Sequence, residues 1–151
     1  MLKIVVIGDV GTGKTSIIRS FLQNSFDINT KPTIGANFFQ KSMIIGGSEI
    51  SIQFWDTTGS EKVWASFDIY LRGCVGVLLV DNYSNYLNAE GLSKSMDKLQ
   101  EWRSVISAKT ALSDGRPVPI VLCLNKCDSI SVQTSEASDR TADESNKLCL
   151  Q

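Results

Sequence analysis

Apolar residues recur along the chain in nearly continuous runs and at helical spacings. Runs of strand length occur at Leu2–Ile7, Cys74–Val80 and Ile120–Leu124. Because these runs hardly alternate with polar residues, they predict strands that are buried on both faces. The segment between the first two runs has a different pattern of apolar and polar residues.

Residues 39–55 predict a β-hairpin. Phe39–Ile45 and Glu49–Trp55 are strand-like and are joined by Gly46-Gly47-Ser48, a sequence suited to a tight turn. In the second strand the apolar side chains share one face, and the polar side chains share the other face with Trp55. This alternation predicts an antiparallel pair with one face toward the core.

Helical spacing predicts three helices between the strands. Residues 14–23 form the first, and residues 61–72 form a broken helix that Gly73 ends. The third carries a stripe that we expect to face the core, formed by Leu92, Met96, Leu99, Trp102 and Ile106. Residues 24–32 and 113–117 predict loops, residues 129–140 are polar, and a weak helical pattern covers 141–150.

Alternating strands and helices predict an α/β fold in one domain over residues 1–151. We expect a mostly parallel central sheet with one antiparallel hairpin strand and helices on both faces. Ligands of such sheets bind at the carboxyl ends of the strands. The loop at 8–15, Asp56 and residues 125–128 each follow the end of a predicted strand. These polar segments should therefore converge.

The loop Gly8–Thr15 fits the pattern G-x-x-x-x-G-K-[ST] between a predicted strand and a predicted helix. Its glycines allow several backbone N–H groups to point at one anion, beside the positive end of the helix. Lys14 would reach the outer phosphates of a nucleotide, and the Thr15 hydroxyl would ligate Mg²⁺. A chance glycine turn is the alternative, and the flanking elements argue against it.

Composition narrows the class of protein. The chain has no histidine, which excludes a Ser-His-Asp triad and a His-ligated zinc site. A hydrophobic content of 42%, a charged content of 21% and a net charge of −1 are typical of an ordinary globular protein and give no reason to expect nucleic acid as a partner. The four cysteines favour reduced thiols in a cytoplasmic protein, and no signal peptide or membrane-spanning run is evident.

Several motifs together resemble the Ras superfamily of small GTPases, and most of all its Rab branch. They are GDVGTGKTS at 8–16, PTIGANF at 32–38, WDTTGSE at 55–61, YLRG at 70–73 and NKCD at 125–128. The resemblance implies a P-loop NTPase fold of the small G-domain type and a GTP/GDP-dependent switch with Mg²⁺ that acts in vesicle trafficking. A P-loop kinase or ATPase is the rival, and the NKCD motif speaks against it.

The resemblance also implies the residues of the nucleotide site. Asp128 would accept hydrogen bonds from the ring N–H and the exocyclic amine of guanine, which adenine cannot offer as a pair. Asn125 would brace the glycine loop, Lys126 would lie over the ring, and Phe26 would pack against its edge or serve only as a loop anchor. The full implied set is Asp9, Val10, Gly11, Thr12, Gly13, Lys14, Thr15, Ser16, Phe26, Thr33, Asp56, Gly59, Asn125, Lys126 and Asp128.

The same resemblance assigns metal and catalytic roles. Thr15, Thr33 and Asp56 would hold Mg²⁺, and the Thr33 and Gly59 N–H groups would bind the γ-phosphate and so order two loops. The implied catalytic set is Lys14, Thr33, Gly59 and Ser60.

An aromatic triad is also implied. Phe38, Trp55 and Tyr70 fall where Rab proteins contact effectors, and core packing is the alternative role for them. The implied partners are effector proteins at the switch regions and an exchange factor.

Two departures from the family bear on hydrolysis. Ser60 stands where the family has a glutamine that orients the attacking water, and Val10 occupies a phosphate-loop position that is usually small. Both predict tight nucleotide binding with slow hydrolysis. The alternative is a GTP-binding interaction module that does not cycle, or one G domain of a larger protein.

A third departure concerns the end of the chain. No Ser-Ala-Lys run follows Asn125, so we expect a G domain that lacks the last strand, the Ser-Ala-Lys loop and the closing helix. The sequence predicts a cytoplasmic protein. It would reach endomembranes only indirectly or through a C-terminal segment that this sequence does not contain. Residues 83–119 are longer than the Rab pattern, and we interpret the excess as loops and a partner surface around the third helix.

Overall fold

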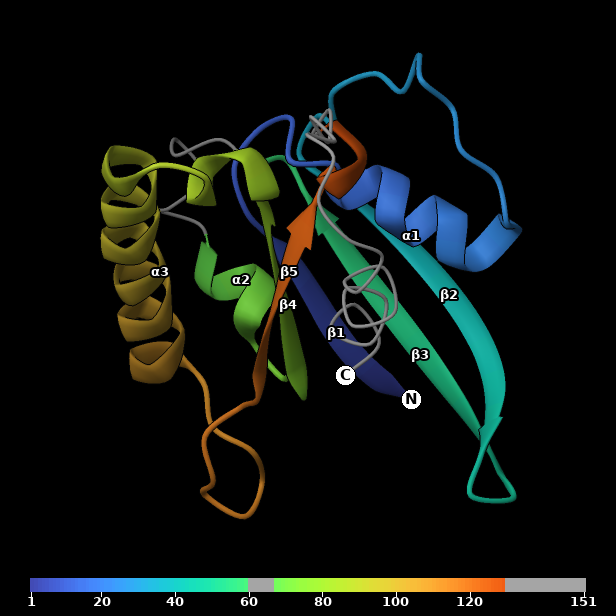
Figure 1. Cartoon of the computed structure of the whole chain (residues 1–151). Coiled ribbons are helices and arrows are strands. Elements are labelled where there is room, and N and C mark those ends of the chain that lie inside the picture. The colour runs from blue at the N-terminus through green and yellow to red at the C-terminus, as the bar shows by residue number, and fades with distance from the viewer. Residues whose placement is uncertain (60–66, 130–151) are drawn as a thin grey trace, which may run out of the picture.

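The structure is a computed structural model that describes residues 1–59 and 67–129. Strands and helices alternate along the chain as the sequence predicts (Figure 1). The elements are β1 Leu2–Ile7, α1 Lys14–Gln23, β2 Ala36–Ile45, β3 Ser48–Thr57, α2 Phe67–Leu71, β4 Gly76–Asn82, the 3₁₀ turn η2 Tyr83–Tyr86, α3 Ala89–Lys109, β5 Ile120–Asn125 and the 3₁₀ turn η3 Cys127–Ser129.

The strands form one sheet in the order β2-β3-β1-β4-β5. β1 pairs in parallel with β3 and β4, β5 pairs in parallel with β4, and β2 runs antiparallel to β3. Val5, Val6 and Ile7 of the central strand are fully buried, which is why the first apolar run shows no alternation. The predicted α/β fold, with a mostly parallel sheet and one antiparallel hairpin, is confirmed.

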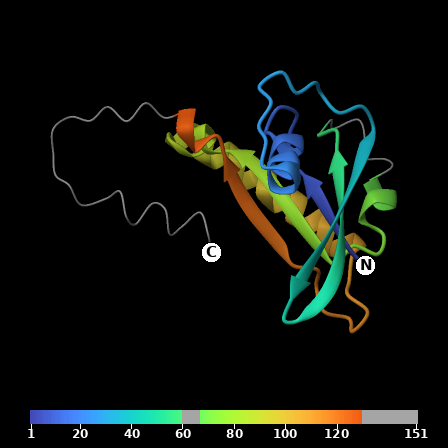
Figure 2. The same ribbon diagram turned by 90° about the vertical axis from the view of Figure 1, so that its right-hand side faces the viewer.

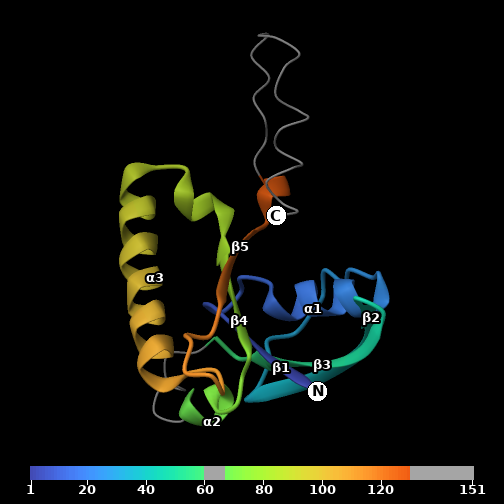
Figure 3. The ribbon, with the colours of Figure 1, turned by 90° about the horizontal axis from the view of Figure 1, so that it is seen from below.

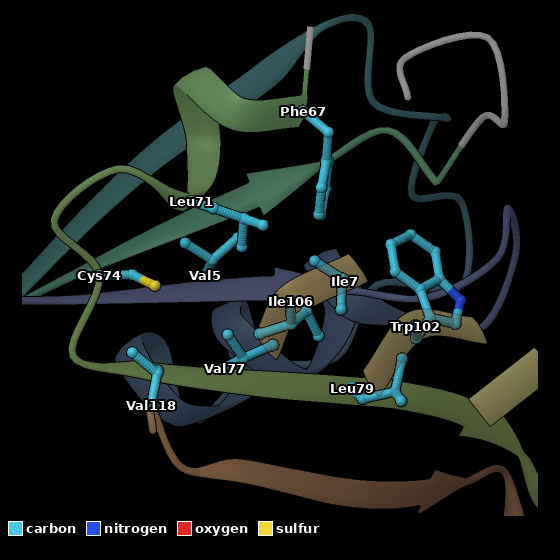
Figure 4. Close-up of a cluster of buried hydrophobic side chains, with 10 residues drawn as sticks. All are labelled: Val5, Ile7, Phe67, Leu71, Cys74, Val77, Leu79, Trp102, Ile106 and Val118. Carbon is cyan, nitrogen blue, oxygen red and sulfur yellow. The ribbon is translucent and has the colours of Figure 1, made fainter. Parts of the chain in front are cut away.

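Helices cover both faces of the sheet, as predicted (Figures 2 and 3). On one face, Ile18 of α1 packs with Val6 and Val80. On the other face, α2 and α3 pack against β1 and β4 in the larger core cluster (Figure 4). That cluster comprises Val5, Ile7, Phe67, Leu71, Cys74, Val77, Leu79, Trp102, Ile106 and Val118.

The hairpin is longer than the sequence predicts and turns more tightly. Ile45 pairs with Ser48, so that only Gly46 and Gly47 form the turn, with φ of 58° and 79°. Two residues with positive φ match the right-handed twist of the flanking strands, which explains the glycine pair. Pairing continues to Ala36 and Thr57 at the other end. Asp56 therefore lies inside β3 rather than after it.

The fourth and fifth strands differ from prediction in position and burial. β4 covers Gly76–Asn82 instead of 74–80, because Asp81 and Asn82 pair with Leu124 and Asn125 of β5. The prediction of a buried run at Ile120–Leu124 is wrong, since Val121 is 58% and Leu122 is 41% exposed. In the described part of the chain β5 is the last strand on its side of the sheet, which leaves these side chains uncovered.

The core-facing stripe of α3 also differs from prediction. Trp102 and Ile106 are buried as expected, but Leu92 and Met96 are 43% and 45% exposed. Ser95, which is small and polar, takes the buried position instead. The N-terminal half of α3 lies beside η2, where Tyr86 donates a hydrogen bond to Asp81, and polar contacts replace apolar packing there. Apolar periodicity alone does not reveal that substitution.

Replacing Ile106 with alanine tests which face of α3 supports the core. Ile106 is fully buried, so Ile106→Ala should lower the free energy of unfolding by about 2–3 kcal/mol through lost contacts and a cavity. Leu92→Ala shortens an exposed side chain on the same helix and should change it by less than about 1 kcal/mol. Urea unfolding followed by circular dichroism measures both variants. Equal losses would contradict the burial assigned to the two faces.

The second helix is described only in part. α2 covers Phe67–Leu71 and ends before Gly73, which adopts φ of 70°. Positive φ suits glycine at a helix end, in agreement with the predicted stop. The remainder of the predicted helix, from 61 to 66, lies outside the described residues. Within residues 1–59 and 67–129, no helix has the length and apolar character needed to cross a membrane.

Candidate functional site

Three loops meet above the carboxyl ends of the parallel strands, at the top of Figure 1. They are the glycine loop between β1 and α1, the segment between α1 and β2, and the turn η3 that follows β5. Together they line a cavity of about 680 Å³. A parallel sheet places its ligand sites at this edge, so the cavity is the candidate site.

The glycine loop wraps around the start of α1 in a conformation that other residues rarely adopt. Gly11 and Gly13 have φ of 80° and 94°, and α1 begins at the next residue, Lys14. A Cβ atom on Gly13 would lie 2.3 Å from the Asn125 side-chain nitrogen, so glycine is required by space as well as by φ. The first N–H groups of α1 therefore lie at the end of the helix that borders the cavity, where an anion is favoured.

Lys14 is a buried cation beside the loop. Its Nζ donates hydrogen bonds to the carbonyl oxygens of Gly8, at 2.9 Å, and Asp9, at 2.7 Å. Burial lowers the pKa of Lys14, and the charges of Asp56 and Asp9 oppose that shift. An ammonium group carries three donors, so the two hydrogen bonds to carbonyl oxygens leave capacity for an acceptor in the cavity that Lys14 lines.

Two hydroxyls of the cavity wall meet one buried carboxylate. The Thr15 hydroxyl donates to Asp56 Oδ2 at 2.6 Å, and the Thr33 hydroxyl lies 2.9 Å from Thr15 Oγ1 and 3.2 Å from Asp56 Oδ2. Asp56 is fully buried, and its Oδ1 has no hydrogen-bond partner among the residues that the structure describes. Burial raises the pKa of Asp56, while the two hydroxyls and Lys14 lower it. A buried carboxylate with a spare oxygen is costly unless something satisfies it.

This donor set fits Mg²⁺. All three side chains offer oxygen, which is the ligand type that Mg²⁺ takes, and a cation would satisfy the spare Asp56 oxygen. Thr15 and Thr33 both line the cavity, so the same ion would be within reach of phosphates held there. The three residues that the resemblance implies as metal ligands thus lie together in the fold.

The NKCD segment forms another part of the cavity wall. The Asn125 side chain donates to the Thr12 carbonyl at 2.8 Å and so joins β5 to the glycine loop. Lys126 adopts φ of 62°, and it lines the cavity with Asp128. Phe26 lines the same cavity and is 74% exposed, so packing against the rest of the chain does not account for it.

Gly59 lies directly against the glycine loop. It adopts φ of 78°, and a Cβ atom there would lie 2.4 Å from Lys14 Nζ and 2.7 Å from the Gly8 oxygen. Only glycine allows this approach, which brings the end of β3 next to the buried ammonium. Ser60, the next predicted site residue, lies outside the described residues.

The structure also separates the predicted residues into lining and supporting groups. Thr12 and Asp56 are buried behind the cavity wall, and Asp9 pairs with Lys98 of α3. Sequence reasoning missed seven lining residues, Asp27, Ile28, Thr30, Lys31, Pro32, Thr57 and Thr58. Most belong to the segment predicted only as a loop. The position of this segment in the sequence could have identified them, because a chain that joins α1 to Thr33 must cross the mouth of the site.

The three aromatic residues predicted as a triad lie in contact on one surface. The Phe38 and Trp55 rings are 4.5 Å apart and those of Trp55 and Tyr70 are 6.1 Å apart, both edge to face. Lys3 Nζ lies 3.5 Å from the centre of the Trp55 ring. Trp55 and Tyr70 also pack against the larger core cluster, while Phe38 is mostly exposed. The cluster is therefore part core and part surface.

Comparison with known proteins identifies relatives over nearly the whole chain. A sequence profile described as the Ras family matches residues 3–149. The Ras-related protein Rab-32A of Dictyostelium discoideum is 33% identical over 151 residues, which cover 99% of this chain and 64% of that protein. The Ras-related protein RABA5c of Arabidopsis thaliana is 34% identical over 88% of this chain and 57% of its own length. The chain spans less than two thirds of these curated relatives.

Proposed function

The chain belongs to the Ras family, and on this basis we propose that it is a Rab-like small GTPase that alternates between GDP and GTP with Mg²⁺. One observation carries the proposal. The buried Lys14, the Thr15–Thr33–Asp56 cluster and the Asn125–Asp128 segment surround a single cavity, although they are far apart in sequence. Phosphate, metal and base recognition are thereby available in one place.

In the proposed complex the chain's own residues divide the nucleotide among them. The glycine loop and the start of α1 bind the phosphates, with Lys14 supplying the charge. Thr15, Thr33 and Asp56 hold Mg²⁺, which neutralises phosphate charge when bound. Asp128 accepts hydrogen bonds from the guanine base, Lys126 covers the ring, and Asn125 keeps the base segment at a fixed position relative to the glycine loop.

The two loops that contact the γ-phosphate would act as the switch. Thr33 reaches the metal cluster from the segment before β2, and Gly59 approaches Lys14 from the end of β3. Loss of the γ-phosphate removes the contact that both loops share, so their positions report which nucleotide is bound. Phe38, Trp55 and Tyr70 lie beside these segments and would present the state to effector proteins, with an exchange factor opening the site.

A role in vesicle trafficking is the finer part of the proposal. It is supported by the likeness to Ras-related proteins of the Rab type. A cytoplasmic protein that reaches endomembranes indirectly, or through a segment beyond this sequence, is consistent with that role.

Slow hydrolysis is the second finer part. Val10 lines the cavity and is 57% exposed, so its branched side chain lies beside the space that a water-orienting residue would need. The Ser60 side chain is too short to orient the attacking water as the glutamine that the family has at this position does. Both features favour a long-lived GTP state.

Single-turnover GTP hydrolysis tests this rate prediction. Val10→Gly combined with Ser60→Gln should raise the rate at least about tenfold, because water orientation is restored and the site is cleared. Ser113→Gln, an exposed change in the loop after α3, is the matched control and should have no effect. A wild-type rate equal to that of the double variant would contradict the prediction of slow turnover. If neither the wild-type chain nor the double variant hydrolyses GTP, the alternative of a GTP-binding module that does not cycle becomes the better account.

A further inference from the structure

Helix α3 contacts the glycine loop through one charged side chain. Lys98 Nζ donates to Asp9 Oδ2, across a separation of 89 residues in sequence. The two residues share a cleft of only about 10 Å³ with Trp102, too small to hold a ligand. The link between α3 and the loop is therefore a direct side-chain contact.

Asp9 is the point at which several parts of the phosphate site meet. Its carbonyl oxygen accepts a hydrogen bond from Lys14 Nζ at 2.7 Å and from the Thr12 hydroxyl at 3.0 Å. A Cβ atom on Gly59 would lie 2.7 Å from the Asp9 carbonyl carbon. A rotation of the Asp9 peptide would thus disturb the lysine, the loop and the end of β3 together.

The Asp9 side chain also carries a negative charge next to a site built for anions. The next residue, Val10, lines the cavity, and the Asp9 carbonyl accepts a hydrogen bond from the Lys14 ammonium, which also lines it. Without a counter-charge, the same carboxylate would repel phosphates in the neighbouring cavity. Lys98 supplies that counter-charge from α3.

We propose that Lys98 is a positioning residue for nucleotide binding, which fixes the Asp9 peptide and cancels the Asp9 charge beside the phosphates. This inference rests on the proposed function, since it presumes a nucleotide in the cavity. It assigns α3 a role in the phosphate site that none of the sequence motifs contains.

An ordinary surface ion pair is the alternative. Lys98 and Asp9 side chains are 36% and 39% exposed, and pairs of that kind contribute little to folding. The positioning role and the ordinary ion pair predict different effects of Lys98 on nucleotide dissociation. A positioning residue changes nucleotide dissociation in a salt-dependent way, whereas a surface pair changes neither dissociation nor its response to salt.

The test is the dissociation rate of a fluorescent GDP analogue from the 151-residue chain at low and high salt. Lys98→Met should speed dissociation about three- to tenfold at low salt, and the difference should shrink as salt screens the Asp9 charge. Lys98→Arg keeps the charge and should stay within about twofold of wild type. Lys94→Met is the matched control, because Lys94 pairs with Glu90 one turn away on the exposed surface of α3 and should behave as wild type.

A second background assigns the effect to Asp9. In Asp9→Asn protein, Lys98→Met should change dissociation by less than about twofold, since the charge that it balances is gone. An undiminished effect in that background, or a Lys98→Met rate equal to that of Lys94→Met, overturns the inference and leaves the proposed function intact. A wild-type chain that retains no guanine nucleotide overturns both.

Discussion

Replacing Lys14 with methionine should weaken the binding of GDP and GTP by about a thousandfold. Lys14 is buried, and its ammonium is held by the Gly8 and Asp9 carbonyls at the wall of the cavity. Charge-assisted hydrogen bonds to phosphate are worth roughly 1.5–3 kcal/mol each, and phosphates left facing an uncharged side chain lose more. Methionine keeps much of the stem volume, so the loss reports the charge rather than a cavity.

Equilibrium displacement of a fluorescent GDP analogue measures the change. Lys31→Met is the matched control, because Lys31 lines the same cavity from an exposed loop position and should lose less than about fivefold. Circular dichroism verifies that both variants are folded. Equal losses for Lys14→Met and Lys31→Met would show that general positive charge, and not the buried ammonium, holds the phosphates.

The central strand and the helix that follows it were the elements that sequence patterns predicted best. The buried run ending in Val5, Val6 and Ile7 and the helix over 14–23 agree with the structure, because a central strand and its following helix leave little choice of face. The NKCD segment and the glycine loop were expected to converge because each follows the end of a predicted strand. Their contact, from Asn125 to the Thr12 carbonyl, agrees with that reasoning.

Predictions failed where neighbours from distant parts of the chain decide the outcome. Leu92 and Met96 follow the helical period of α3 but lie outside the core, because Ser95 occupies the buried position beside η2. Val121 and Leu122 are apolar yet exposed in an edge strand of the described sheet. Local pattern gives the period of an element, but its partners determine which face is covered.

Side-chain contacts across the fold were also beyond sequence reasoning. Nothing in the neighbourhood of Lys98 distinguishes it from the other lysines of α3, and only the packing of α3 beside β4 brings it to Asp9. The residues between α1 and Thr33 were predicted only as a loop, although several line the cavity. Motif spacing locates the chemical groups that a family shares. It does not locate the supports that a particular chain adds around them.

Replacing Asp128 with alanine should abolish discrimination between guanine and hypoxanthine. Asp128 lines the same cavity as Thr15 and Thr33, on the turn that follows β5. A carboxylate accepts from both the ring N–H and the exocyclic amine of guanine, whereas hypoxanthine lacks the amine. Because a hydrogen bond to a charged group is worth roughly 1.5–3 kcal/mol, wild type should prefer GDP to IDP by at least about tenfold.

In Asp128→Ala protein both hydrogen bonds are lost, so GDP affinity should fall by about 300-fold and the GDP-to-IDP ratio should approach one. Asp27→Ala is the matched control, since Asp27 lines the same cavity but its carboxylate accepts from the Asn29 N–H within its own loop. Competition of GDP, IDP and ADP against a fluorescent GDP analogue provides all three affinities. A preference for GDP that persists in Asp128→Ala would place base recognition elsewhere. Wild-type protein that binds ADP as well as GDP would favour the kinase or ATPase alternative. If the preference for GDP over IDP is lost in Asp128→Ala, which leaves Lys14 and the Thr15–Thr33–Asp56 group unchanged, then base recognition and phosphate binding belong to separate parts of the same cavity.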